Sequence, residues 1–450
     1  MPQLSWPRRT LRALLQLDRP APARSEDDVA AEVARNYPWN FTVNLLDGAA
    51  FWLGLSFAST TTIMPLFISK LSDSPLPLGL LAVLAQGGWF LPQLFTARAV
   101  EQLPRKKAVV VNLGFFLERV PMWFLPAAAL LALRSPSLAL VLFLLAYAWH
   151  AVGAGAVGPA WQDLIARCFP VARRGRFLGL TTFIGTGLGA LGGLLSGRLL
   201  ATLAFPANFA VTFAIAAAAI TLSWAFLALT REPVQAVQGP RRTPRQFWSE
   251  LPGILRRDDN FRRFLLGRGL LALSGMGLGF VTVAAVNRWS VPDHVVGGYT
   301  AAMLIGQTAG NLLFGFLADR HGHKLCLELS ALAALLAYGL AWLAPNPAWY
   351  FAVFALLGLR LGGVLVSGIL VVLEFSAPER RPTYVGLANT GVGIVGSLAP
   401  LLGAGLAGVG YSWLFALSAS AGLASLLVLR WWVQEPRWAA AANELHTPSL

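Results

Sequence analysis

Four acidic, basic or histidine residues of this sequence lie near the middle of long apolar runs. Glu118 and Arg119 share one run, His150 lies in the next, and Arg360 lies in a later one. At bilayer depth an ionisable side chain costs about 2.5–3.5 kcal/mol or more, so it usually faces a cavity and has a function. A buried carboxyl such as Glu118 is suited to taking up a proton. A buried guanidinium such as Arg360 is suited to binding an anion or to pairing with Glu118.

A structural role explains the same residues equally well, because an ion pair that holds helices together also retains buried charges. Adjacent residues point about 100° apart on a helix, so Glu118 and Arg119 need not pair with each other. Two amide residues, Gln93 and Asn311, complete the candidates for a central cavity, where they are suited to bonding a substrate or a neighbouring helix. Asp47 has the sequence position of a helix cap or a gate residue.

Other reactive residues are not arranged for catalysis or metal binding. Serine, cysteine and histidine form no pattern typical of a catalytic triad. Cys168 and Cys326 have neither a disulfide nor a metal spacing, and His321 and His323 lack further ligands nearby. Two G-x-G-x-x-G patterns lie within apolar runs, where helix packing explains them better than nucleotide binding. We therefore expect no enzyme activity, no metal and no cofactor.

The elements that carry the candidate residues are predicted to be membrane-spanning helices. Hydrophobic residues make up 56% of the 450 residues and charged residues 12%, whereas soluble domains contain about 25% charged residues. A run of about 20 apolar residues is long enough to span a bilayer as a helix. The runs of this length are 44–69, 76–97, 108–133, 137–165, 177–200, 207–230, 264–287, 298–318, 325–344, 348–373, 384–407 and 411–431.

Basic residues are distributed unevenly around these twelve runs. Of the 35 Lys and Arg residues, 28 lie in the two tails, in the segments after even-numbered runs or, as Arg430 does, at the end of the last run beside the C-terminal tail. Only four lie in the segments after odd-numbered runs. Since cytoplasmic loops carry the positive excess, we expect a multi-pass protein of the cell membrane with both termini in the cytoplasm. The net charge of +14 is not gathered in one arm, so we expect no nucleic-acid partner.

The chain contains an internal repeat of six spans. Residues 173–195 (RRGRFLGLTTFIGTGLGALGGLL) align with residues 380–402 (RRPTYVGLANTGVGIVGSLAPLL), and REP at 231–233 corresponds to QEP at 434–436. Two like halves are common in membrane transport proteins. The predicted parts are a cytoplasmic tail 1–43, a six-helix bundle 44–230, a cytoplasmic linker 231–263 with a basic amphipathic helix, a second six-helix bundle 264–433 and a cytoplasmic tail 434–450.

A charged, glycine-flanked stretch, GFLADRHGHK, separates the eighth and ninth runs. It resembles the loop signature of the major facilitator superfamily, G-x-L-a-D-r-x-G-r-k, although His323 stands where that pattern has arginine. The corresponding stretch after the second run, ARAVEQLPRK, is degenerate but keeps the charge order. The motif residues of the two loops are Gly315, Asp319, Arg320, Gly322, Lys324, Glu101, Arg105 and Lys106.

The resemblance implies an all-α membrane protein of twelve helices in two six-helix pseudo-repeat bundles. It also implies secondary active transport of a small molecule by alternating access, with the loop acting as a latch and protons as one candidate coupling ion. Gly315 is expected to let helices approach closely, and Gly322 to take a positive φ. Alternatively, the loop charges only keep the loop in water and obey the positive-inside rule.

Charge pairs are also expected at the inner ends of the helices. Asp163 and Glu374 are predicted to pair with loop arginines such as Arg173 and Arg380. The basic linker favours contact with anionic membrane lipids, and we expect a monomer. A non-transporting sensor or scaffold with the same fold is the alternative function. The residues do not indicate the substrate, its direction of movement or the coupling ion.

Overall fold

The computed structural model describes residues 6–19, 21, 24–234, 253–368, 370–375 and 381–436, and these residues form helices and connecting segments without a strand. Eleven of the described helices are long and apolar enough to cross a membrane. They match eleven of the twelve predicted spans. The predicted all-α membrane fold is therefore confirmed. Most of the predicted amphipathic helix of the linker, and most of the C-terminal tail, lie outside the described residues.

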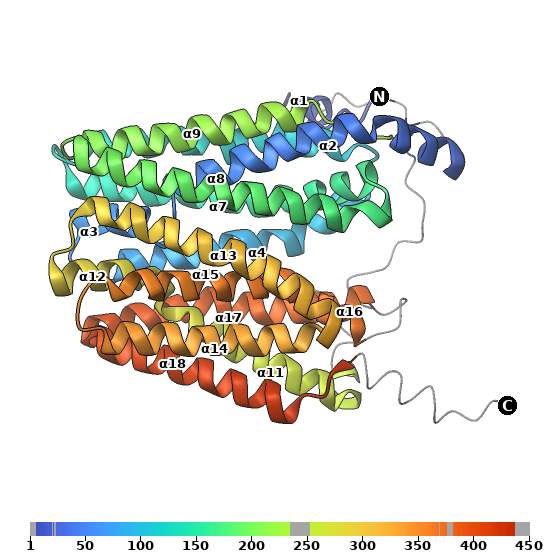
Figure 1. The fold of residues 1–450 in the computed structure, drawn as a ribbon. Helices are drawn as coiled ribbons and strands as arrows, with labels where there is room; N and C mark the ends of the chain where they lie inside the picture. The colour runs from blue at the N-terminus through green and yellow to red at the C-terminus, as the bar shows by residue number, and fades with distance from the viewer. Residues whose placement is uncertain are drawn as a thin grey trace. The chain divides into compact units, whose positions relative to one another are not determined.

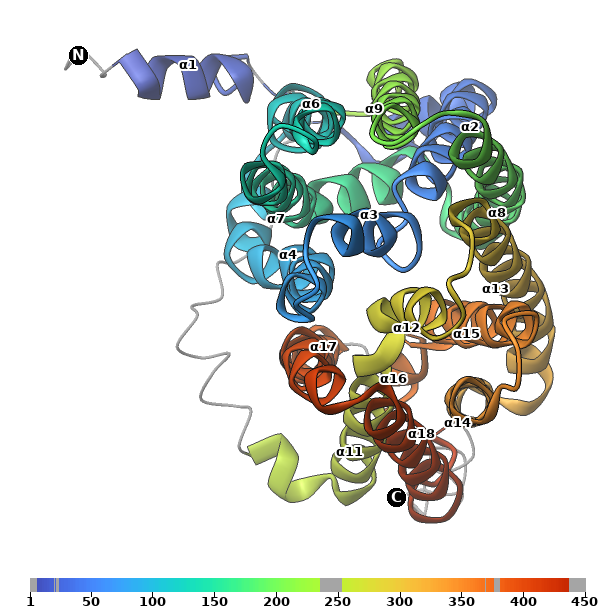
Figure 2. The same cartoon turned by 90° about the vertical axis from the view of Figure 1, so that its left-hand side faces the viewer.

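The chain divides into two compact units (Figures 1 and 2). Unit 1 comprises Met1–Ala58 and Leu84–Pro240, and unit 2 comprises Ser59–Val83 and Arg241–Leu450. The helices up to the linker are α1 (Trp6–Leu14), α2 (Glu26–Phe57), α3 (Ile63–Leu71), α4 (Leu76–Glu101), α5 (Lys106–Ala108), η1 (Val109–Leu113), η2 (Phe115–Arg119), η3 (Val120–Trp123), α6 (Phe124–Leu131), α7 (Pro136–Cys168), α8 (Val171–Thr202) and α9 (Ala207–Ala228). In unit 1, α2 packs against α8 and α9, and α6 packs against α7.

The helices after the linker all belong to unit 2. They are α11 (Asp259–Ser274), η4 (Gly275–Phe280), α12 (Val281–Trp289), α13 (Asp293–His321), α14 (His323–Leu343), α15 (Trp349–Ser367), α16 (Leu370–Glu374), α17 (Arg381–Val409), α18 (Tyr411–Leu427) and η5 (Val428–Trp432). Helix α15 packs against α13 and α14, and α11 packs against α17 and α18 (Figure 2).

The first predicted span, 44–69, is a broken helix. Helix α2 begins upstream of it, where the Ser25 hydroxyl accepts a hydrogen bond from the Asp28 amide and caps the helix. The helix ends at Phe57, and α3 begins at Ile63. Pro65 interrupts this run in the sequence, but the break in the helix precedes it, because Pro65 lies in the first turn of α3.

The segment after this break packs within unit 2. The Thr62 and Thr300 hydroxyl oxygens are 2.6 Å apart, which joins the start of α3 to α13. The Thr282 hydroxyl of α12 donates to the Thr61 carbonyl oxygen at 2.8 Å. At the far end of α3, Lys70 Nζ lies 2.7 Å from Asp293 Oδ1. These contacts attach α3 to two helices that follow it by more than 200 residues.

Two predicted spans contain turns that are not α-helical. The span Lys106–Leu131 includes the π-helical segments η1 and η2 and the 3₁₀ segment η3. Pro121 lies in η3 and lacks the N–H that an α-helix needs at this point. The span Asp259–Trp289 contains the 3₁₀ segment η4. Such turns are frequent at functional sites, and these two lie beside the buried charges described below.

Candidate functional site

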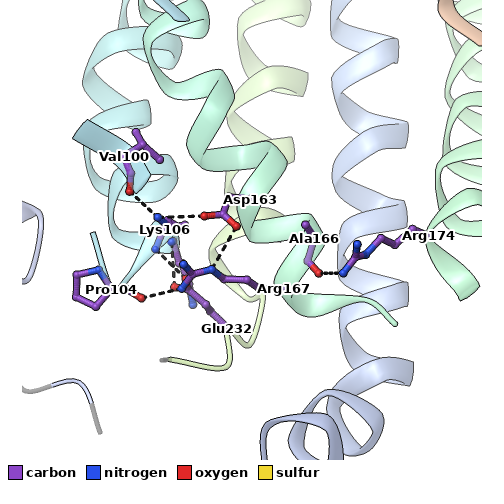
Figure 3. Close-up of polar contacts among 9 residues, drawn as sticks. Val100, Pro104, Lys106, Asp163, Ala166, Arg167, Arg174 and Glu232 are labelled. Carbon is purple, nitrogen blue, oxygen red and sulfur yellow. Dashed lines mark hydrogen bonds and ion pairs between the residues drawn. The ribbon is translucent and has the colours of Figure 1, made fainter. Parts of the chain in front are cut away.

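One end of unit 1 carries a cluster of four charged residues, Lys106, Asp163, Arg167 and Glu232, called the Lys106 cluster below (Figure 3). The Lys106 side chain is fully buried, and its Nζ lies 3.0 Å from Asp163 Oδ2. The Nε of Arg167 lies 3.3 Å from the other oxygen of Asp163. The cluster thus joins the start of α5 to the last turn of α7.

Glu232 joins the segment after α9 to the same place. Its carboxylate accepts hydrogen bonds from the backbone amides of Lys106 at 2.8 Å and Lys107 at 3.0 Å. These amides lie at the start of a helix, where the first N–H groups have no partner within the helix and the helix dipole favours negative charge. The Arg167 side chain also donates to the Pro104 carbonyl oxygen at 3.0 Å. The cluster is therefore a network across three segments of unit 1.

The structure corrects the pairing predicted for Asp163. Asp163 pairs with Lys106 and with Arg167, whereas Arg173 lies 4.7 Å from the centre of the Tyr37 ring. Arg167 is one helical turn from Asp163, so the i, i+4 spacing was the signal that could have identified it. The prediction for Glu374 remains untested, because Arg380 lies outside the described residues.

Of the other motif residues of this loop, Arg105 contacts a different segment of the chain. The Nη1 atom of Arg105 donates to the Arg19 carbonyl oxygen at 2.8 Å, which ties the loop to the segment after α1. The side chain of Glu101 lies outside what the structure describes. Lys106 is thus the motif residue with the most central position in this loop.

Glu232 should make the stability of unit 1 depend on pH. Burial raises the pKa of its carboxyl, and the hydrogen bonds from the Lys106 and Lys107 amides only partly oppose that rise. A carboxyl with a higher pKa in the folded than in the unfolded state makes the free energy of unfolding fall as the pH rises through the folded pKa. We therefore expect wild-type protein to lose stability relative to Glu232→Gln above the ordinary carboxyl pKa of about 4.3. Melting temperatures of both proteins across a pH series would measure this, and a constant difference would contradict it.

The corresponding loop of unit 2 lies between α13 and α14. Gly322 has φ +88°, as predicted, and this conformation allows the turn between the two helices. Lys324 Nζ lies 3.1 Å from Glu328 Oε1, and Arg430 lies 3.7 Å from the other oxygen of Glu328. The buried His323 ring shares a hydrogen bond of 3.1 Å with the Ser367 hydroxyl.

The remaining residues of the GFLADRHGHK motif lie at the last turns of α13. Asp319 and Arg320 are at exposed positions. The expectation that Gly315 permits close helix packing was wrong, because a Cβ atom placed there would meet nothing within 4 Å. Glu328, which sequence reasoning missed, lies one helical turn after Lys324, and that i, i+4 spacing was its signal.

A second group of buried charges lies within unit 1. Glu118 and Arg119 form an ion pair although they are neighbours in the chain, and both are buried. The His150 Nδ1 atom lies 2.8 Å from the backbone oxygen of Glu118. Asp47 is buried too, and its carboxylate accepts a hydrogen bond of 2.6 Å from Ser223. Three of the predicted cavity residues, Glu118, Arg119 and His150, are thus brought together.

The geometry of this group follows from the helix irregularities around it. Glu118 and Arg119 end the π-helical segment η2, and η3 with Pro121 follows directly. Asp47 is not a helix cap, because α2 begins at Glu26 and extends well upstream of the apolar run. The Nε atom of Arg119 has no hydrogen-bond partner among the described residues. The group therefore holds two carboxylates, one guanidinium and one imidazole away from bulk water.

The other predicted cavity residues have different surroundings. Gln93 donates to the Trp89 carbonyl oxygen of its own helix at 2.7 Å. Arg360 and Asn311 lie in unit 2. The Asn311 amide has no hydrogen-bond partner among the described residues, and Arg360 donates to the Leu271 carbonyl oxygen at 2.8 Å. Arg268, also buried in unit 2, was not among the predicted residues because it lies near the start of its apolar run.

Comparison with known proteins adds a family and a fold. Residues 271–447 match the family model of the Major Facilitator Superfamily. The chain is 29% identical to organic cation/carnitine transporter 7 of Arabidopsis thaliana over 38% of this chain and 36% of that protein. It is 33% identical to the 3-(3-hydroxy-phenyl)propionate transporter of Escherichia coli K12 over 34% of this chain and 39% of that protein. It is 28% identical to the niacin transporter NiaP of Acinetobacter baylyi over 28% of each chain. The matched segments span about a third of the length of these relatives.

Solved structures share the fold over most of the chain. A transporter of the POT family in complex with 5-aminolevulinic acid has a TM-score of 0.65 and 12% identity, and the match covers 86% of this chain and 95% of that one. The major facilitator superfamily transporter FucP in the outward conformation has a TM-score of 0.57 and 14% identity, covering 88% and 98%. At these identities the likeness shows the fold alone.

Proposed function

We propose that this chain is a secondary active transporter of the major facilitator superfamily, which moves a small molecule across the cell membrane by alternating access. The observation that carries the proposal is the buried group of Glu118, Arg119 and His150 in unit 1. Ionisable groups at membrane depth are costly and typically mark substrate or proton pathways. Proton coupling through Glu118 and a cytoplasmic position of both termini are parts of the same proposal.

The names of the relatives indicate which compounds to test first. Carnitine, niacin and 3-(3-hydroxyphenyl)propionate are small organic molecules, and each bears a carboxylate. A panel that contains these three, a sugar and an organic cation covers several chemical classes. This panel assumes no particular substrate for this chain and gives the assay defined compounds to begin with.

Solute counterflow in proteoliposomes tests transport directly. Vesicles loaded with unlabelled compound should accumulate the labelled compound transiently, and a pH gradient should then drive net uptake. Vesicles without protein are the control for leakage. Binding of a panel compound without any counterflow would contradict the transport proposal and favour the sensor or scaffold function.

The loop between α13 and α14 is proposed to act as a latch for one conformational state. Asp319→Ala should slow counterflow while leaving the melting temperature unchanged, because Asp319 is exposed and its replacement leaves the packed interior intact. Asp73→Ala, which removes an exposed carboxylate between α3 and α4, is the matched control. Counterflow in Asp319→Ala at the wild-type rate would show that the loop charges only keep the loop in water.

A further inference from the structure

Unit 2 contains two buried arginines without a carboxylate partner. The relative exposure of Arg268 is 8% and that of Arg360 is 6%. No described carboxylate forms an ion pair with either of them. The carboxylates of this unit with described ion pairs have other partners: Asp259 pairs with Arg262, Asp293 with Lys70, and Glu328 with Lys324 and Arg430. Burying an unpaired positive charge is costly, so such a pair of residues calls for an explanation.

Arg360 reaches from α15 to the end of α11. Its Nη2 atom donates to the Leu271 carbonyl oxygen at 2.8 Å. This carbonyl has no bond to the Gly275 amide, because α11 changes to the 3₁₀ segment η4, where that amide bonds to Ala272 and Leu273 instead. It also accepts a hydrogen bond from the Ser274 hydroxyl at 2.7 Å. A Cβ atom on Gly275 would lie 3.2 Å from the Arg360 guanidinium, so the guanidinium lies directly against this turn.

Arg268 reaches in the opposite direction, from α11 to the end of α15. A Cβ atom on Gly368 would lie 3.0 Å from its Nη2 atom. Because Arg360 of α15 bonds to α11 and Arg268 of α11 reaches the end of α15, both guanidinium groups lie between these two helices. The two side chains therefore concentrate positive charge between the same two helices, although like charges repel. One carbonyl bond at Arg360 does not neutralise this charge.

Further polar atoms without partners gather around the same turn. The Nε atom of Arg360, the Tyr338 hydroxyl and the Ser418 hydroxyl are buried and have no hydrogen-bond partner among the described residues. Tyr338 and Ser418 both approach Gly277 of η4, since a Cβ atom there would lie 2.8 Å from the Tyr338 ring and 3.0 Å from the Ser418 oxygen. Buried polar atoms are normally hydrogen-bonded, so this place offers several unused hydrogen-bond donors.

We propose that Arg268 and Arg360 bind the carboxylate of an organic anion, with the Tyr338 and Ser418 hydroxyls as additional donors. This inference rests on the proposed transport function and names its substrate class. A carboxylate supplies the missing negative charge and matches the planar fork of donors that a guanidinium presents.

Binding to the purified full-length protein in detergent tests the proposal without requiring transport. Nicotinate and 3-(3-hydroxyphenyl)propionate should raise the melting temperature in a saturable manner, whereas their neutral amides should not. Arg268→Gln and Arg360→Gln should each weaken binding of the carboxylate by at least about tenfold, which corresponds to about 1.4 kcal/mol. Arg262→Gln, which removes an exposed arginine from the same helix, should bind as the wild type does.

The outcomes separate this inference from the proposed function. Equal stabilisation by acid and amide, or wild-type affinity in both Gln variants, would overturn the carboxylate site. Stabilisation by inorganic phosphate but by no carboxylate would also overturn it. Counterflow of a sugar or a cation with no carboxylate binding would leave transport standing and remove this site. Arginine-dependent carboxylate binding without counterflow would support this site and contradict the transport proposal. If a Gln variant fails to fold, the comparison of acid and amide on the wild-type protein still tests whether binding requires a carboxylate.

Discussion

Glu118→Gln is expected to reduce uptake driven by a pH gradient to the level of protein-free vesicles, while counterflow of the same solute continues. Glutamine has nearly the shape of glutamate but cannot take up and release a proton. Counterflow requires only that the carrier reorients with solute bound, so it does not need the proton. The loss should therefore be confined to the step that couples solute movement to the gradient.

The second buried carboxylate of unit 1 provides the control. Asp47→Asn removes a charge of the same sign from the same unit, where Asp47 accepts a hydrogen bond from Ser223. If Glu118 carries the proton, Asp47→Asn should keep gradient-driven uptake. Full gradient-driven uptake in Glu118→Gln would refute the role of Glu118, and loss of coupling in Asp47→Asn alone would assign the proton to Asp47.

Asp163→Asn is expected to destabilise the protein more than Lys106→Met does. Asp163→Asn removes the carboxylate that lies 3.0 Å from the fully buried ammonium of Lys106. Breaking a buried ion pair in this way costs about 3–5 kcal/mol, and the partial exposure of Asp163 reduces the expected loss to about 2 kcal/mol. Lys106→Met keeps an apolar chain of similar length in the buried position. Asp163 then still has Arg167, 3.3 Å away, and contact with solvent.

Thermal unfolding in detergent would measure this difference. The melting temperature should fall in the order wild type, Lys106→Met, Asp163→Asn. The exposed pair of Arg262 and Asp259 offers a control, because surface ion pairs contribute about 0–1 kcal/mol and Asp259→Asn should change little. A larger loss in Lys106→Met than in Asp163→Asn would contradict this assignment of the buried charge.

The sequence was sufficient to predict most of the helices, because their length and apolar composition are properties of single segments. The positions of side chains relative to one another depend on packing and on local helix geometry, which composition does not reveal. The predicted run ends at residue 165, which puts Arg167 in the loop, whereas α7 extends to Cys168 and holds Arg167 one turn from Asp163 on the same helix. The pairing of Glu118 with Arg119 accompanies the π-helical segment η2, for which the apolar run contains no distinct signal.

Arg268 illustrates the same limit at a helix boundary. Its predicted run began at residue 264, which placed Arg268 near the membrane surface, whereas α11 begins at Asp259 and the residue is buried. Gly322 illustrates the opposite case. Glycine alone populates positive φ without steric cost, so its residue type was enough to predict the conformation of the turn.

The attachment of α3 to α12 and α13 has a consequence for expressing the protein as two separate fragments. A break in the linker would produce an N-terminal fragment that carries α3 and a C-terminal fragment that carries the helices on which α3 packs. The C-terminal fragment made alone would then leave the Thr282 hydroxyl without its partner, the Thr61 carbonyl oxygen, whereas the Thr300 hydroxyl would keep its bond to the Val296 carbonyl oxygen. Co-expressed fragments would therefore have to bring α3 back to this packing surface by association, and a break after Val83 would impose the same requirement.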